Sequence, residues 1–190
     1  MRVIAGKYRS RRLVAPAGIQ TRPTSDRLRE TLFNVVAPSV EGSAWLDLFA
    51  GTGAVGIEAL SRGARMVYFV ESSSRAVRTI RANLASLGIG QGVEVLEREA
   101  IAALRLLEAQ PSAFDFCFLD PPYRKADTYE QILSFLSQSR LLKQGGLIIA
   151  EHDKHFDPGE SFGLLRRQRK LRQGDAVLSF YGRESVPQQP

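Results

Sequence analysis

Short apolar runs alternate with segments of helical periodicity through the middle of this 190-residue chain. The apolar runs, typical of buried strands, cover residues 44–49, 66–70, 93–96, 114–119 and 147–151. The helical segments between them cover residues 54–62, 73–87, 100–109 and 129–137. Strands that alternate with helices form parallel sheets, and strands that are apolar throughout need a helix layer on each face. The order therefore predicts an α/β fold with a mostly parallel sheet.

The C-terminal part departs from this alternation. Residues 164–171 and 176–181 have the pattern of two strands, joined through Gln173-Gly174-Asp175. We expect them to add an antiparallel hairpin to the sheet, which would then have seven strands.

The N-terminal part departs from it as well. Residues 2–5 and 12–15 predict a short β-hairpin around residues 6–11. Ser25 or Asp26 can cap a helix that ends before Pro38. We therefore divide the chain into a basic hairpin and loop over residues 1–24, a main domain over 25–183 and a disordered tail over 184–190.

The positive charge is concentrated at the N-terminus. Residues 1–29 hold eight basic side chains and one acid, a net +7, so the remaining residues carry −1 of the total +6. A basic segment on a nearly neutral body is typical of proteins that bind a polyanion. The expected contacts to such a polyanion are Arg2, Lys7, Arg9, Arg11, Arg12, Arg22, Thr24 and Arg27. The alternatives are a solvated surface segment and a device for solubility.

Several classes of protein are disfavoured by composition. Cys117 is the single cysteine and lies in an apolar run, which favours a buried strand thiol in a reducing cytoplasm. We expect no secretion signal, no membrane span and no metal site, because long apolar segments and Cys/His clusters are missing. His152 and His155 are interpreted as loop residues after the last parallel strand.

A glycine-rich loop follows the first strand of the alternating series. The segment Asp47-Leu48-Phe49-Ala50-Gly51-Thr52-Gly53-Ala54-Val55-Gly56 contains G-x-G-x-x-G and leads into a helix. Glycine permits a sharp turn and the close approach of a ligand. The spacing suits a dinucleotide as well as S-adenosylmethionine, so this motif alone does not decide between them. Asp47 at the strand end can meet the ammonium group of a methionine moiety.

An acid follows the next strand. Glu71 lies 18 residues beyond Gly53, where a carboxylate can accept both ribose hydroxyls of an adenosine. A surface acid or a helix cap near Ser72 is the alternative.

The segment Asp120-Pro121-Pro122-Tyr123 favours a methyltransferase over a dinucleotide enzyme. It follows the apolar run 114–119, so it should lie at the carboxyl edge of the sheet, where ligands of open α/β folds bind. Two prolines make a rigid turn, which can direct the Asp120 carboxylate and the Pro121 carbonyl oxygen at one amino group. Tyr123 offers a flat face on which a base can stack.

This turn suits an exocyclic amine of a base, whose lone pair is delocalised into the ring. Accepting its hydrogens at Asp120 and Pro121 would free the lone pair for attack on a sulfonium methyl. Positioning can supply about 7–11 kcal/mol in favourable cases. The base must leave its stack to reach such a pocket.

These motifs, with the block Thr21-Arg22-Pro23-Thr24-Ser25-Asp26-Arg27-Leu28-Arg29-Glu30-Thr31-Leu32-Phe33-Asn34 and the opening Arg2-Val3-Ile4-Ala5-Gly6, resemble one family. The family is the bacterial 16S ribosomal RNA guanine-N2 methyltransferases of the RsmD type, and the resemblance covers about residues 2–182. It implies a Rossmann-like class I methyltransferase fold, S-adenosylmethionine as cofactor and one guanine of the small ribosomal subunit as target, on an assembled or assembling 30S particle. It also implies that the basic hairpin grips RNA phosphates. We expect a monomer.

The resemblance assigns roles to particular residues. Those expected at the cofactor are Asp47, Phe49, Gly51, Gly53, Glu71, Ser72, Glu99 and Ala100. Those expected at the target amine are Asp120, Pro121, Pro122 and Tyr123. The family usually has Gly-Asp-Ala where this chain has Arg98-Glu99-Ala100, so the side chain near the adenine would be one methylene longer.

Two other functions stay open. The same turn serves amino methyltransferases that act on adenine in DNA or on glutamine side chains, although no added target-recognition domain is evident. A non-catalytic RNA-binding or assembly factor could also retain the fold, but the intact Asp120–Tyr123 turn argues against it.

Overall fold

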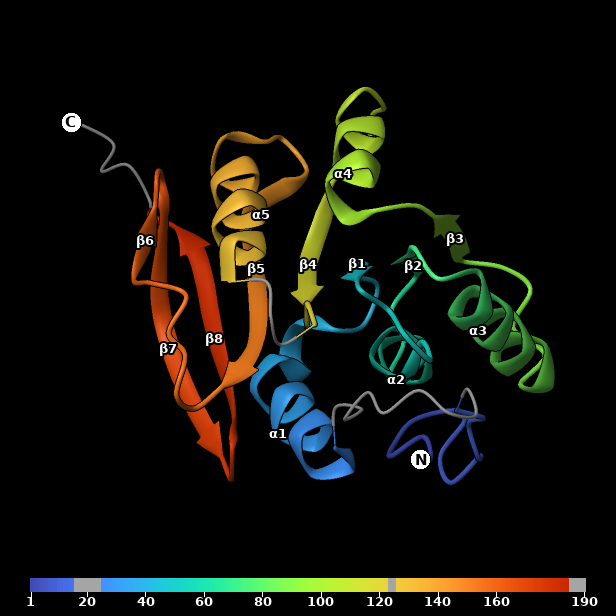
Figure 1. Cartoon of the computed structure of the whole chain (residues 1–190). Helices are drawn as coiled ribbons and strands as arrows, with labels where there is room; N and C mark the ends of the chain where they lie inside the picture. The colour runs from blue at the N-terminus through green and yellow to red at the C-terminus, as the bar shows by residue number, and fades with distance from the viewer. Residues whose placement is uncertain (16–24, 123–125, 185–190) are drawn as a thin grey trace.

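The computed structural model describes residues 1–15, 25–122 and 126–184. Within them, eight strands form one sheet in the order β3-β2-β1-β4-β5-β8-β7-β6 (Figure 1). The five parallel strands are β1 (Ala44–Leu48), β2 (Met66–Glu71), β3 (Val93–Glu97), β4 (Phe114–Leu119) and β5 (Leu142–Asp153). The predicted α/β class with a mostly parallel sheet is confirmed.

The C-terminal strands are antiparallel, as expected. β8 (Ala176–Arg183) pairs with β5, and β7 (Leu165–Gln173) pairs with β8. A two-residue strand, β6 (Ser161–Phe162), pairs with the start of β7 and makes the described strands eight where seven were expected.

Strand β5 is longer at both ends than the predicted 147–151. Its pairing with β4 shifts register between Phe114 and Phe116, whose partners are Leu142 and Leu147, and Gly145 between those partners has a φ of 74°. Glycines in sequence indicate a turn, so the first part of β5 was missed. At the other end, His152 belongs to β5 and is buried, with Nε2 2.9 Å from the Ser179 hydroxyl. The interpretation of His152 as a loop residue was wrong.

Helices cover both faces of the sheet (Figure 1). One core joins the sheet to α1 (Asp26–Val36), α2 (Ala54–Ser61) and α3 (Ser74–Ser86), and a second joins it to α4 (Ala100–Glu108) and α5 (Ala126–Gln138). A single 3-10 turn, η1 (Ala37–Ser39), follows α1. Successive residues of β1 alternate between the two cores, Trp45 into the first and Leu46 into the second.

The first core is aromatic where α1 meets the sheet. Trp45 stacks on Phe33 of α1 and on Phe116 of β4, with ring centroids 5.2 and 4.5 Å apart. The start of α1 is capped as predicted, because the Ser25 hydroxyl accepts a hydrogen bond from Leu28 N at 3.1 Å.

The N-terminal segment forms a short, turn-rich hairpin. One antiparallel bridge joins Arg2 to Arg12, and Val3 N donates to the Arg11 carbonyl oxygen at 2.9 Å, so the two predicted arms pair as expected but their strands are shorter than the predicted 2–5 and 12–15. The segment also forms hydrogen bonds with helix α2. The Glu58 carboxylate accepts from Ile4 N at 2.8 Å and Ala5 N at 3.0 Å. Residues 1–15 are hereafter called the N-terminal hairpin.

The hairpin also contributes to the main core. Val3 and Leu13 are buried in the same cluster as α1 and α2. No helix in the described part of the chain is long and apolar enough to cross a membrane.

Candidate active site

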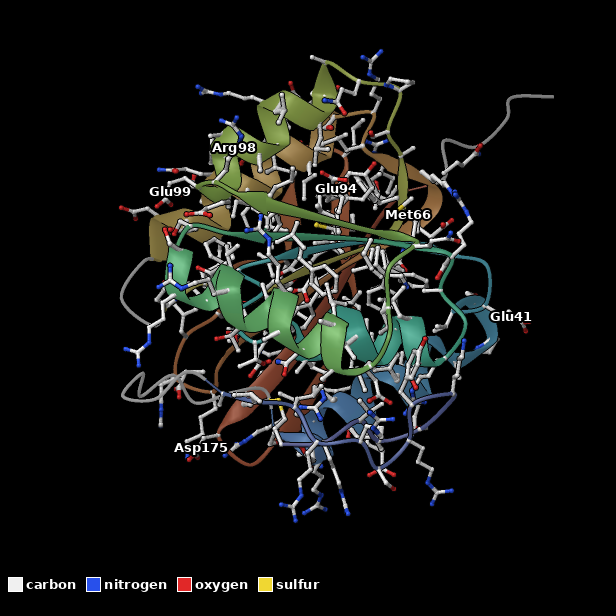
Figure 2. All side chains as sticks on the ribbon, turned by 90° about the vertical axis from the view of Figure 1, so that its right-hand side faces the viewer. Glu41, Met66, Glu94, Arg98, Glu99 and Asp175 are labelled. Carbon is white, nitrogen blue, oxygen red and sulfur yellow. The ribbon has the colours of Figure 1, made fainter. Side chains whose placement is uncertain are left out.

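The carboxyl ends of the parallel strands meet at one edge of the sheet. Asp47 on β1 is in register with Phe118 on β4, and Leu48 with Leu119, so Asp120 emerges beside the glycine-rich loop. Glu71 ends β2 on the other side of β1. Figure 2 shows Glu99 at the same end of the strands and Met66, the first residue of β2, at the opposite end. The sheet therefore brings together four sequence-distant acids that were predicted for one site.

The glycine-rich loop turns through unusual backbone conformations. Phe49, Gly51 and Gly53 have φ of 64°, 56° and 77°. A Cβ added to Gly51 would meet only the Phe49 carbonyl oxygen, at 3.9 Å, so the space above this glycine is open. A Cβ on Gly56 would lie 2.3 Å from the Phe69 ring, so Gly56 serves close helix–sheet packing. Gly51 thus faces open space, whereas Gly53, whose added Cβ would lie 3.3 Å from the Phe69 ring, and Gly56 both pack against the sheet.

Asp47 holds the end of β1 against the start of α2. Its Oδ2 accepts a hydrogen bond from Gly56 N at 3.0 Å, in the first turn of that helix. Burial raises the pKa of Asp47 to about 7, the Gly56 hydrogen bond opposes the rise, and the nearby Glu71 charge adds to it. A buried carboxyl with so high a pKa gains from any cation placed beside it.

Glu71 joins two loops at the same edge. Its Oε2 accepts from Gly51 N at 2.9 Å, and its Oε1 accepts from Ser73 N at 2.9 Å. Each carboxylate oxygen can accept a second hydrogen bond. Its place beside Gly51 is compatible with the expected ribose contact, which stays a prediction.

The other residues predicted for the cofactor differ in exposure. Ser72 is exposed beside Glu71. Glu99 is exposed at the N-cap of α4 and its side chain makes no capping hydrogen bond, while Ala100 is buried as the first residue of that helix. Glu99 can therefore turn toward a ligand at no cost to the helix cap.

Asp120 lies half-buried directly after β4, and its pKa is raised well above the ordinary value. Burial is the main cause, followed by the charges of Glu151 and Asp47. Pro121 is buried and Pro122 is exposed, whereas Tyr123 lies outside the described residues. The structure thus places the carboxyl and the rigid turn at the edge.

Glu151 was missed by the sequence reasoning. It is buried near the carboxyl end of β5, and the register Leu119–Ala150 puts it next to Asp120 on the neighbouring strand. An acid at the end of an apolar strand was the available signal, because the same signal identified Glu71 and Asp120.

Asn83 was missed as well. This α3 side chain is fully buried and bonds to the peptide of Val14, and its Nδ2 also donates to the Thr52 carbonyl oxygen at 3.0 Å. It ties the end of the N-terminal hairpin to the glycine-rich loop. A buried asparagine on the apolar face of a helix was a weak signal that sequence alone could not resolve.

The basic side chains of the hairpin are exposed. They are Arg2, Lys7, Arg9, Arg11 and Arg12, and Arg27 on α1 is exposed too. Arg22 and Thr24 lie outside the described residues. Arg11 also donates to the Ser86 carbonyl oxygen at 2.8 Å, which anchors the hairpin to α3.

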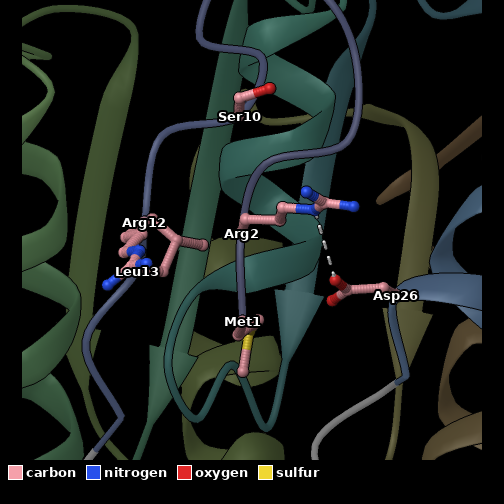
Figure 3. A pocket seen from close by; sticks show the side chains of 6 residues that line it. All are labelled: Met1, Arg2, Ser10, Arg12, Leu13 and Asp26. Atoms are coloured by element: carbon pink, nitrogen blue, oxygen red, sulfur yellow. Dashed lines mark ion pairs between the residues drawn. The ribbon is translucent and has the colours of Figure 1, made fainter.

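A pocket of about 580 Å³ opens where the hairpin meets the start of α1 (Figure 3). Its lining residues are Met1, Arg2, Ser10, Arg12, Leu13 and Asp26. The Arg2 Nε lies 4.0 Å from Asp26 Oδ2. Since the Thr52 hydroxyl lies 3.6 Å from the Met1 sulfur, this basic pocket adjoins the glycine-rich loop.

Neither the cysteine nor the histidines add a reactive group to this site. Cys117 is buried in β4 as predicted, and burial raises the pKa of its thiol. Burial lowers the pKa of His152, and His155 is exposed in a turn. Within the described ranges, no group of three or more His, Cys, Asp or Glu side chains could hold a metal ion.

The chain is similar to known proteins over most of its length. A family model described as Conserved hypothetical protein 95 matches residues 1–182. The Ribosomal RNA small subunit methyltransferase D of Haemophilus influenzae is 39% identical over 171 residues, which are 88% of this chain and 88% of the relative.

Two solved structures extend the comparison. The yhhF protein of Escherichia coli has a TM-score of 0.84 at 32% identity, over 97% of this chain and 98% of its own. SMU.776, crystallised in complex with SAH, has a TM-score of 0.65 at 16% identity, over 80% of this chain and 48% of its own, and shares the fold.

Proposed function

Because the chain belongs to the family described as Conserved hypothetical protein 95, the family of the RsmD-type methyltransferases, we propose that it methylates 16S ribosomal RNA. The reaction proposed is the transfer of a methyl group from S-adenosylmethionine to the exocyclic N2 of one guanine. The observation that carries this is the position of Asp120 and Pro121, one strand away from the open glycine-rich loop.

The residues at the edge fit S-adenosylmethionine. Gly51 leaves open space for close approach, and Asp47 is a buried carboxyl that a nearby cation would favour in its ionised form. Asp47, Gly51 and Gly53 would hold the methionine part, Glu71 and Ser72 the ribose, and Phe49, Glu99 and Ala100 the adenine end. When bound, the cofactor supplies an electrophilic methyl group.

Asp120 and Pro121 act on the target amine. The Asp120 carboxylate and the Pro121 carbonyl oxygen accept the two amine hydrogens, which directs the nitrogen lone pair away from the turn. Pro121 and Pro122 carry no amide hydrogen to compete for these acceptors. The role of Tyr123 is to stack on the guanine, as the sequence predicts.

The basic side chains of the N-terminal hairpin, together with Arg22, Thr24 and Arg27, contact RNA phosphates in this proposal. Phosphate contacts fix the register of the protein on the RNA, while the pocket selects the base. The substrate is a small ribosomal subunit particle in the cytoplasm, and the enzyme acts as a monomer.

Mass mapping of ribosomal RNA tests the proposal. A strain without the gene should lack one methylguanosine, and the purified protein with S-adenosylmethionine should restore it on 30S particles from that strain. The Asp120→Asn variant should restore none while binding the cofactor like the wild type. Methylation of adenine in DNA, methylation of a glutamine side chain, or RNA binding without any methyl transfer would overturn the proposal.

A further inference from the structure

Strand β7 is the most basic strand of the sheet. Its nine residues, Leu165–Gln173, include five basic side chains and no acid: Arg166, Arg167, Arg169, Lys170 and Arg172. The net charge of −1 beyond residue 29 does not show the positive charge of this strand, because acids elsewhere in that part of the sequence balance it. Only the contacts show which of its charges are neutralised.

Three of the five are paired with acids. Arg167 lies 2.5 Å from Asp157, Lys170 lies 2.7 Å from the same carboxylate, and Arg166 lies 3.3 Å from Glu184. Arg169 and Arg172 are exposed, and neither forms an ion pair with any described residue. The Arg172 Nε donates to the Gly174 carbonyl oxygen at 3.0 Å, which leaves its charge uncompensated.

The end of β7 lies at the same edge as the candidate active site. Gln173 of β7 and Asp153 of β5 both pair with Ala176, so these two strands end level with each other on either side of β8, and β5 adjoins β4 with Asp120. Figure 2 places Asp175, in the β7–β8 turn, toward the same end of the molecule as Glu99. The end of β7 and Asp120 therefore lie at the same end of the sheet, with β5 and β8 between them.

Helix α1 separates β7 from the N-terminal hairpin. The Gln173 carboxamide lies 2.7 Å from the Thr31 hydroxyl of α1, and Asp26 at the start of α1 lines the hairpin pocket. Figure 1 shows the hairpin, α1 and the β7–β8 ends in this order along one end of the molecule. Two basic surfaces thus lie on either side of one helix.

The far part of β7 is an open sheet edge. β6 pairs only with Leu165 and Arg166. Beyond them, Arg167 N donates to the Glu160 carbonyl oxygen, and no described strand covers the rest. Arg169 is paired with Phe180 and Arg172 with Val177, so the two guanidinium groups project from opposite faces and a phosphate chain crossing the edge can meet both.

We propose that Arg169 and Arg172 bind phosphates of the RNA whose guanine enters the active site, across α1 from the N-terminal hairpin. This inference rests on the proposed function. Guanidinium groups bind phosphate through two parallel hydrogen bonds, and exposed ones need no compensating acid in the free protein. Charged side chains on an edge strand can also serve to prevent strand pairing between molecules, and the experiment must separate the two roles.

The test compares two double variants that remove the same charge. Arg169→Gln with Arg172→Gln alters β7. Arg65→Gln with Arg105→Gln alters two exposed arginines. One lies just before β2 and the other in the last turn of α4, so both are near the amino ends of the parallel strands, away from the candidate active site. Binding to a protein-free 16S rRNA fragment is measured over a range of salt concentrations, along with cofactor binding and sedimentation.

The β7 variant should lose about 1.4–1.8 units of slope in log K against log salt, which corresponds to two phosphate contacts. Its KM for RNA should rise while kcat and cofactor binding stay unchanged, and the control should keep the wild-type slope. If the slope of log K against log salt is equal in both variants, the inference is overturned and the proposed function stays intact. The same holds if the β7 variant self-associates while its slope is unchanged. Wild-type protein that binds the fragment but never methylates 30S particles would overturn the proposed function alone.

Discussion

The carboxamide of Asn83 forms two hydrogen bonds with the backbone of Val14. Its Oδ1 accepts from Val14 N at 2.8 Å, and its Nδ2 donates to the Val14 carbonyl oxygen at 3.0 Å. Because the same Nδ2 reaches Thr52, a single side chain connects the N-terminal hairpin with the glycine-rich loop.

We expect Asn83→Ala to lower the free energy of unfolding by about 2 kcal/mol, because three hydrogen bonds are lost and the Thr52 carbonyl is left without this donor. Urea denaturation measures the change. Arg81→Ala, on the exposed side of the same helix, should stay within about 0.5 kcal/mol of the wild type. If both substitutions change the free energy of unfolding equally, the hydrogen bonds of Asn83 do not contribute to stability.

Gly6 fits the hairpin against α2 with no room for a side chain. A Cβ there would lie 1.8 Å from the Ser61 carbonyl oxygen, and φ is +78°. Gly42 has a similar φ of +71° with nothing within 4 Å, so Gly42→Ala should cost only the backbone strain of about 1–2 kcal/mol. Gly6→Ala should cost clearly more in thermal or urea unfolding. Equal costs would mean that the hairpin moves freely away from α2.

The raised pKa of Asp47 makes stability depend on pH. Its folded value of about 7 exceeds that of an unfolded aspartate, so its stabilising contribution is complete below about pH 4 and is lost as the pH rises to 7. Asp47→Asn keeps an oxygen for Gly56 and removes the titration. The wild type should therefore lose about 2–4 kcal/mol more than this variant between pH 4 and pH 8. Parallel pH profiles of unfolding would contradict this.

Glu151 should influence the pH dependence of methyl transfer. Its charge helps to raise the pKa of Asp120, and Asp120 accepts its amine hydrogen as the ionised carboxylate, while the Pro121 carbonyl oxygen accepts the other. Activity should then rise with pH along a limb above the ordinary aspartate range. Glu151→Gln should move that limb to lower pH, and Glu94→Gln, on exposed β3, should not. The measurement is kcat/KM as a function of pH for the wild type and both variants. If the rising limb of the Glu151→Gln profile stays at the wild-type pH, Glu151 does not have this role.

The hairpin charges should determine the salt dependence of RNA binding. Replacing Arg9, Arg11 and Arg12 with Ala should weaken binding and lower the slope of log K against log salt by about 0.7–0.9 for each lost phosphate contact. Fluorescence titration with a 16S rRNA fragment provides the slopes. A variant with the wild-type slope would make the hairpin a feature of solubility.

Local patterns in the sequence were sufficient for much of the fold. Apolar runs, helical periodicity and capping residues are properties of neighbouring residues, so β4 and the start of α1 were predicted at their observed positions. The same locality made Asp47, Glu71 and Asp120 recognisable, since each lies at the end of an apolar strand. Local patterns failed at Gly145, where a glycine inside β5 has the sequence appearance of a turn.

What the sequence determined by itself was the series of strands and helices and the acids at the strand ends. Only the tertiary structure decided which of these acids are neighbours, that Asn83 reaches a backbone group 69 residues away, and that β7 ends at the same end of the sheet as the candidate active site. The physical reason is that such contacts depend on strand order and register, which follow from packing the whole sheet. Charge neutralisation on β7 depends on the same packing, because Asp157 and Glu184 reach its arginines through space.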